Sequence, residues 1–234
     1  MVTFFLTVAQ WILDPTHWQG TDGIPTRVGE HLLLSGVSLA IAIVVALPVG
    51  IGVGHTGRGA LLVINVAGIG RALPSLAILA LALPLAFGLG LGLGFWPTVI
   101  ALVPLGIPLI LLSSFTAIRE VDREIVEVAR GMGMGERQVL RTVELPLAAP
   151  VILDGIRTAA VTIVATATLG ALVASGGLGR YIVDGLARQD QPRLFVGALL
   201  VALLAIATEI GFAWLARVVV PKPLRSATSP DPGP

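Results

Sequence analysis

Five long apolar stretches alternate with short polar segments along the chain. They cover residues His31–Gly54, Ala60–Phe87, Trp96–Ile118, Ala148–Ala174 and Leu194–Val220. Each stretch exceeds the roughly 20 residues that an α-helix needs to cross the hydrocarbon core of a bilayer. None alternates apolar and polar residues as the strands of a membrane β-barrel do. The pattern therefore predicts an all-α integral membrane protein with about five transmembrane helices.

Composition supports a membrane environment and limits the classes of partner. Of the 234 residues, 55% are hydrophobic and only 12% are charged, whereas soluble domains carry about 25% charged residues. A net charge of +1 argues against a nucleic-acid partner. The chain has no cysteine, which excludes disulfides and thiolate–metal sites, and we predict no metal site and no catalytic residue.

The distribution of basic residues predicts the orientation, because cytoplasmic loops of membrane proteins are enriched in Lys and Arg. With the N-terminus outside, nine basic residues fall on the inner side and four on the outer side. The inner group is Arg58, Arg119, Arg123, Arg130, Arg137, Arg141, Arg217, Lys222 and Arg225, and the outer group is Arg27, Arg180, Arg188 and Arg193. The C-terminus is then cytoplasmic.

Three regions follow from this topology. Residues 1–30 form an extracytoplasmic segment, in which the apolar stretch Met1–Leu13 lacks the basic start of a signal peptide. It is short for a span, so we predict a helix that lies at the membrane interface and ends near Asp14. Residues 31–220 form a single transmembrane domain. Residues 221–234 are polar and rich in proline, which predicts a disordered cytoplasmic tail.

The segment 119–147 interrupts the apolar pattern with alternating acidic and basic residues. Its first part is predicted to be an amphipathic helix, in which spacings of three and four place apolar residues on one stripe. That stripe comprises Val121, Ile125, Val128, Ala129 and Met132. On the opposite face, Glu127 can pair with Arg123 and with Arg130. Gly133 and its neighbouring glycines permit a sharp turn.

A second helix is predicted over Glu136–Glu144, burying Val139, Leu140 and Val143. Pro146 should stop this helix before the next span, since proline lacks the N–H donor and clashes with the preceding turn. From the residues alone, the hairpin is either a plain connection or a surface for a protein partner. Its polar face carries both signs of charge, which disfavours a role in lying on the bilayer.

The same segment resembles the EAA signature of ABC-importer permeases. Glu127-Val128-Ala129 is followed after three residues by Gly133, after nine more by Val143, and then by Leu145-Pro146. Val128 and Val143 are the two departures from the pattern, which has Ala and Ile there. GHTGRG (54–59), GRALPSLAILAL (70–81), the stretch 131–161 and GGLGRYIVDGLARQD (176–190) are similar to the branch that carries osmoprotectants. Ser113-Ser114-Phe115 stands where that branch often has Asn-Thr-Tyr, which affects the prediction of substrate rather than of family.

The resemblance implies a MetI-like permease fold and a mechanism. The hairpin would be the coupling helix that seats in a cytoplasmic ABC ATPase, so that ATP binding drives the pore between outward and inward access. The residues implied in coupling are Glu127, Ala129, Arg130, Gly133, Val143, Leu145 and Pro146. The resemblance implies that ATP and Mg²⁺ belong to the ATPase and that this chain is a transport subunit rather than an enzyme, which accounts for the lack of a P-loop in the chain. The resemblance also implies an extracytoplasmic substrate-binding protein, a second permease copy or a sister permease, and a bacterial inner membrane.

A few polar residues inside the apolar stretches are candidates for the transport path. Arg71 lies at membrane depth, where a charge is costly unless hydrated or paired, so it either lines the path or its gate or extends to the interface. Pro74 beside it is predicted to kink the span. Thr162 and Thr166 either line a pore or allow close helix packing. Asp154 and Arg157 are predicted to brace one another, and Glu209 to make a hydrogen bond between helices.

Two alternative functions differ in energy source or substrate. A secondary transporter driven by an ion gradient calls for inverted repeats with broken helices or a series of intramembrane acids, and the sequence offers only Glu209 and Asp154. A permease for another small solute, such as methionine or an alkyl sulfonate, would share the hairpin. The chain has few aromatic residues (5%) to form a cage for a quaternary ammonium, which assigns selectivity mainly to the binding protein.

Overall fold

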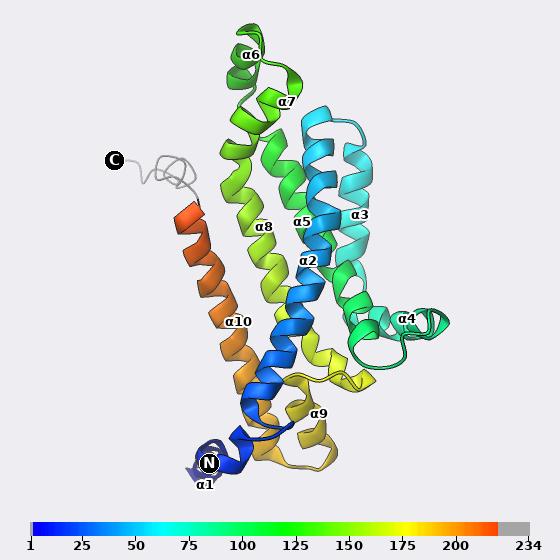
Figure 1. Ribbon diagram of the computed structural model, residues 1–234, viewed down its shortest axis with the longest axis vertical. Helices are drawn as coiled ribbons and strands as arrows, with labels where there is room; N and C mark the ends of the chain where they lie inside the picture. Colours follow the sequence, from blue (N-terminus) through cyan, green and yellow to red (C-terminus); the bar gives the residue numbers. More distant parts are fainter. Residues whose placement is uncertain (1, 220–234) are drawn as a thin grey trace.

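The computed structural model describes residues 2–219, and every regular element in that range is helical (Figure 1). Four helical stretches are long and apolar enough to cross a membrane. They are α2 (Ile24–Thr56), α5 (Phe95–Arg119), the stretch Glu136–Val173 that includes α8 (Leu145–Thr166), and α10 (Gln191–Val219). These match four of the predicted spans and confirm the all-α membrane fold. Val220 and the predicted tail 221–234 lie outside the described residues.

The predicted span Ala60–Phe87 is not one continuous helix. It consists of α3 (Ala60–Ala72) and α4 (Ser75–Gly88), whose axes are bent by 98°. The bend has a local cause: Leu73 and Pro74 are both extended, with ψ of 127° and 128°, and a residue before proline avoids the helical region. Figure 1 shows α4 projecting sideways from the bundle. The predicted kink at Pro74 is therefore a full break, and five spans result when the bent pair counts as one.

The core of the bundle lies where α2, α5 and α8 pack together. Its buried apolar side chains include Ala42 and Ala46 of α2, Ile110 and Leu111 of α5, and Ile152 of α8. Small residues let membrane helices approach one another closely. The closest approaches are at glycines, where an added Cβ would collide with the neighbouring helix. The clearest cases are Gly50 against Ser114, Gly106 against Ile163, and Gly155 against Ser113.

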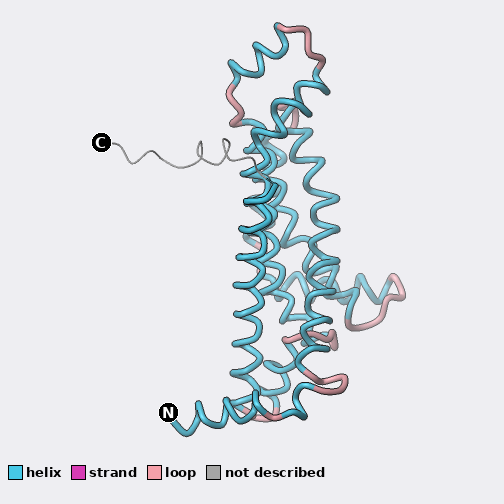
Figure 2. Tube along the Cα trace, turned by 60° about the vertical axis from the view of Figure 1, so that its left-hand side comes forward, coloured by secondary structure: helices cyan, strands magenta, loops and turns pink. Residues whose placement is uncertain are grey.

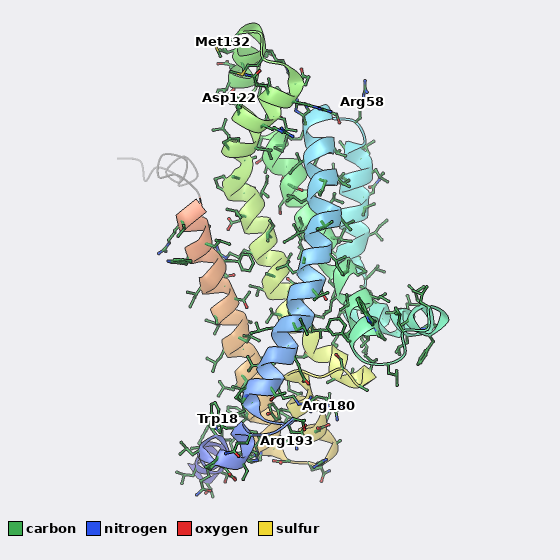
Figure 3. All side chains as sticks on the ribbon, in the orientation of Figure 1. Trp18, Arg58, Asp122, Met132, Arg180 and Arg193 are labelled. Atoms are coloured by element: carbon green, nitrogen blue, oxygen red, sulfur yellow. The ribbon has the colours of Figure 1, made fainter. Side chains whose placement is uncertain are left out.

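The loops divide between two ends of the bundle. Arg58, in the α2–α3 turn, lies at the same end as the hairpin residues Asp122 and Met132 (Figure 3). The opposite end holds Arg180 and Arg193 together with α1 (Val2–Leu13), the 3-10 helix η1 (Pro15–Trp18) and α9 (Gly179–Ala187). Figure 2 shows α1 running across this end rather than along the spans. Arg58, one of the basic residues assigned to the inner side, thus lies at the same end of the bundle as the hairpin.

Candidate functional site

The hairpin 119–147 projects beyond the spans (Figure 1) and contains the predicted pair of short helices. These are α6 (Arg123–Gly131) and α7 (Glu136–Val139). The Asp122 carboxylate caps α6 by accepting a hydrogen bond of 2.8 Å from the Glu124 N–H. Val126 and Ala129 of α6 and Val139 of α7 are buried against one another. The hairpin therefore has a small core of its own.

Gly133 makes the turn that closes this hairpin. Its φ is +87°, a left-handed conformation that glycine adopts without strain. The Gly133 N–H donates to the Arg130 carbonyl at 2.9 Å, and the Met134 N–H donates to the Ala129 carbonyl at 3.2 Å. This pair of bonds is the Schellman arrangement that ends helices at a glycine. Open space surrounds the Gly133 Cα, so backbone conformation rather than crowding calls for glycine here.

The predicted apolar stripe of α6 divides between two environments. Ala129 is buried, but Ile125, Val128 and Met132 are 46%, 61% and 68% exposed. The prediction that the stripe forms a single surface was wrong. The small core contains Val126 and Ala129, whereas Ile125, Val128 and Met132 lie on the outside. We call Ile125, Val128 and Met132 the tip patch. Met132 lies at the outermost point of the hairpin in Figure 3.

Arg130 pairs across the turn with Glu136, whereas the sequence predicted a pair with Glu127 along the same helix. Its Nε and Nη2 donate to Glu136 Oε1 and Oε2 at 3.0 and 2.9 Å, a two-point geometry that favours ionised partners. This bond lowers the pKa of the Glu136 carboxyl below its ordinary range. The predicted partner Glu127 is exposed. Sequence spacing within α6 favoured the local pair, but the turn at Gly133 brings Glu136 closer to Arg130.

His55 and Glu144 connect the hairpin with the bundle, a contact that sequence reasoning missed. His55 Nδ1 lies 2.5 Å from Glu144 Oε2, and His55 Nε2 lies 3.3 Å from Glu136 Oε2. Glu144 is buried. His55 ends α2, 89 positions before Glu144, and no local sequence pattern links residues so far apart.

Pro146 does not stop the second hairpin helix, contrary to expectation. Residues Leu140–Glu144 form a π-helical turn, η2, that continues directly into α8. The Leu145 N–H donates to the Leu140 carbonyl five residues back. Wider π turns are frequent at functional sites, and here the turn relieves the clash between the proline ring and the carbonyl four residues earlier. Val143 and Leu145 are half-buried on this turn.

The structure pairs Asp154 with Arg157 and adds Glu209 to them. Arg157 Nη1 lies 3.3 Å from Asp154 Oδ1 on α8, and Arg157 Nε donates to Glu209 Oε1 of α10 at 2.7 Å. Together with Ser113 and Gly155 these residues line a cavity of about 340 Å³ between α5, α8 and α10. Glu209 thus makes the predicted hydrogen bond between helices, as an ion pair with Arg157.

The remaining predicted path residues lie apart from the hairpin. Arg71 is exposed at the end of α3, where its Nε donates to the Ala67 carbonyl at 3.3 Å. Pro74 caps α4 at the break. Thr162 donates to the Thr158 carbonyl at 2.8 Å, and Thr166 lines a small cavity between α4, α5 and α8. Over residues 2–219 we find no cluster of three or more His, Asp or Glu side chains that could hold a metal ion.

Comparison with known proteins adds three findings. The profile of a family described as binding-protein-dependent transport system inner membrane component matches residues 39–222. The chain is 38% identical over 199 residues to a glycine betaine/carnitine/choline transport system permease protein of Bacillus subtilis (strain 168), covering 85% of this chain and 89% of that one. It is 37% identical to a carnitine transport permease protein of Listeria monocytogenes, covering 97% and 96%. Among solved structures, a chain of the inward-facing MetNI methionine ABC transporter matches with a TM-score of 0.74 at 22% identity, covering 89% of this chain and 99% of that one.

Proposed function

Because the chain belongs to the family of binding-protein-dependent transport system inner membrane components, the permease subunits of ABC importers, we propose that it carries a small osmoprotectant such as glycine betaine, choline or carnitine. Support comes from the relatives at 37–38% identity, which are named as permeases for these solutes. Their alignments extend over most of both chains. The methionine transporter, at 22% identity, supports the fold alone.

The hairpin is the proposed site of coupling to the ATPase. The observation that carries this assignment is the tip patch, three exposed apolar side chains of the hairpin, of which Met132 lies at the outermost point in Figure 3. Exposed apolar groups that share one face mark sites of interaction, and the patch is held firmly by the small core and the Gly133 turn. Glu127 and Arg130 flank it as charged contacts. In this proposal the hairpin end and the C-terminus are cytoplasmic, as the count of basic residues predicts.

The proposed partners follow from the same role. A cytoplasmic ABC ATPase hydrolyses ATP with Mg²⁺, and an extracytoplasmic binding protein delivers solute to the end that carries α1 and α9. A second copy of this chain or a sister permease completes the path. Arg71 and Pro74 at the break between α3 and α4, and Thr162 and Thr166 on α8, are proposed to face that path. Asp154 and Arg157 are proposed to brace α8 above the hairpin.

The test is uptake by the chain reconstituted in vesicles with its ATPase and binding protein. Glycine betaine, choline, carnitine and methionine are supplied in parallel, with and without ATP. We expect ATP-dependent uptake of at least one of the first three solutes. Uptake of methionine alone would favour a permease for another small solute. Uptake that proceeds without ATP and collapses with an ionophore would identify a secondary transporter and refute the proposal.

A variant pair isolates the tip patch. Val128→Asp places a charge in the centre of the patch on an exposed side chain, so the hairpin should keep its fold. We expect it to abolish co-purification with the ATPase and ATP-driven uptake. Arg58→Asp is the matched control, since Arg58 is an exposed residue at the same end outside the patch. Equal ATPase binding by both variants would exclude the patch as the docking surface.

A further inference from the structure

Four charged side chains from four elements form one line of contacts where the hairpin meets the bundle. Arg130 of α6 binds Glu136 of α7 at 2.9 Å, and Glu136 lies 3.3 Å from the Nε2 of His55 at the end of α2. The Nδ1 of His55 lies 2.5 Å from the Glu144 carboxylate in the π turn. Basic and acidic groups alternate along this line. It joins α2 to a hairpin that is distant from it in sequence.

The geometry requires a protonated ring at His55. A neutral imidazole has a single N–H, so it can donate to one carboxylate only. Here both ring nitrogens face carboxylate oxygens, and both contacts are attractive only when both nitrogens carry a proton. The four charges then sum to zero. Glu144 is only 5% exposed, and a buried carboxylate without an opposite charge is costly.

Other charged groups near His55 come from α5 and α6. A small polar cavity beside the ring is lined by His55 and Glu144 and by four further charged residues, Arg119, Arg123, Glu127 and Arg130. The arginines oppose a positive charge on the ring, and Glu127 favours it. These four side chains are exposed, where water and salt weaken their influence. The two carboxylates in direct contact are therefore the main partners of the ring.

We propose that His55 is a positioning residue that, in its protonated form, clasps the hairpin to α2. The hairpin already continues into α8 through the π turn, whereas α2 leads into α3 and has no such continuity with the hairpin. Because of this clasp, α2 moves when the hairpin moves, as α8 does. Loss of these contacts lowers the amount of solute transported per ATP, because the hairpin then moves without α2. The inference rests on the proposed coupling role of the hairpin.

The experiment uses the complete importer in vesicles and measures solute transported per ATP hydrolysed. His55→Gln and Glu144→Gln remove the charge from either member of the closest pair with little change in size. We expect each to lower the ratio about tenfold, a coupling loss of ordinary size between two sites, while ATPase binding stays unchanged. The exchange variant H55E/E144H restores the pair in reverse and should recover much of the ratio. Arg58→Gln, which removes a positive charge three residues from His55, should behave as wild type.

The exchange variant separates a paired clasp from simple packing, since it restores the pair with both side chains replaced. A wild-type ratio in His55→Gln would overturn the proposal. Single variants that uncouple, with an exchange variant no better than either, would overturn the direct pairing.

A further variant covers the case in which changes at the buried pair prevent folding. Glu136→Gln alters an exposed carboxylate and weakens both the 3.3 Å contact with the ring and the two-point bond to Arg130, while the closest pair, His55 and Glu144, stays intact. It should give an intermediate ratio, and a wild-type ratio would count against the clasp. Absence of ATP-driven uptake in the wild type itself would instead refute the proposed function.

Discussion

Gly50→Ala should destabilise the bundle, because a Cβ added at Gly50 of α2 would collide with α5. An added Cβ would lie 1.9 Å from the Ser114 hydroxyl oxygen and 2.8 Å from the Leu111 carbonyl oxygen. Ser114 cannot rotate away freely, since its hydroxyl bonds to the Ile110 and Leu111 carbonyls at 2.7 and 3.2 Å. Rotation would also leave the Leu111 carbonyl in place. The two helices must therefore move apart.

The magnitude follows from three opposing terms. Overpacking a close-fitted interior costs about 1–3 kcal/mol, and disturbing the Ser114 hydrogen bond adds about 1 kcal/mol. Replacing glycine by alanine inside a helix returns about 1 kcal/mol. The net loss of unfolding free energy is about 1–3 kcal/mol, a factor of roughly 5 to 150 in the unfolding equilibrium.

The assay is denaturant unfolding of the purified chain in mixed micelles, with Gly36→Ala as the control. Gly36 lies on the same helix with nothing within 4 Å of an added Cβ, so only the helix-propensity term applies and the variant should be as stable as wild type or slightly more so. The double variant Gly50→Ala/Ser114→Ala should recover part of the loss, because the shortest contact is gone. A Gly50→Ala protein as stable as Gly36→Ala would refute the reasoning.

Three further predictions concern the hairpin and the ion pairs. Gly133→Ala forces an L-residue to φ +87° at a cost of about 1–2 kcal/mol and should speed hydrogen exchange of the Met134 amide. The control Gly131→Ala, in α6 with open space around an added Cβ, should leave that exchange rate unchanged. Equal exchange rates in the two variants would contradict the role of Gly133 in the turn. Arg157 and Glu209 pair between two membrane-spanning stretches, where an unpaired charge is costly. A double-mutant cycle with Arg157→Gln and Glu209→Gln should therefore give a coupling above the roughly 0–1 kcal/mol of pairs in water, and a coupling near zero would contradict the pairing. Because the pKa of Glu136 is lowered in the folded protein, its bond to Arg130 stabilises the hairpin fully at pH values above the ordinary glutamate pKa. This stabilisation is lost as the pH falls through the lower folded-state pKa. An acid titration monitored by the amide chemical shifts of the hairpin should show the loss in the wild type and not in Glu136→Gln.

The four long spans could be predicted closely, because unbroken apolar length alone specifies a helix in lipid. The predicted third span, Trp96–Ile118, differs from α5 by one residue at each end. The second span was predicted only in part. Both halves of Ala60–Phe87 are apolar, and Pro74 signals a kink without giving its angle. The 98° bend depends on two successive extended residues.

Within the hairpin, local chemistry could be predicted and long-range chemistry could not. Gly133 was identified as the turn because glycine has a distinctive conformational role. The division of the apolar stripe could not be foreseen, since a nine-residue helix with one broad apolar face does not specify which part of that face packs on α7. His55 gave no signal in a polar turn. Its partners became apparent only when the fold brought the end of α2 beside the π turn.

The contacts around the hairpin define what can move as one body. The hairpin is continuous with α8 through the π turn and bound to α2 through His55, while α2 and α8 share one core with α5. Arg157 extends this unit to α10 through Glu209. The chain changes direction at Leu73 and Pro74, where no helical hydrogen-bond ladder resists bending. In the proposed coupling, a displacement of the hairpin would therefore move α2, α5, α8 and α10 together. The break between α3 and α4 is the point where α4 can shift relative to that unit with the least loss of backbone hydrogen bonds.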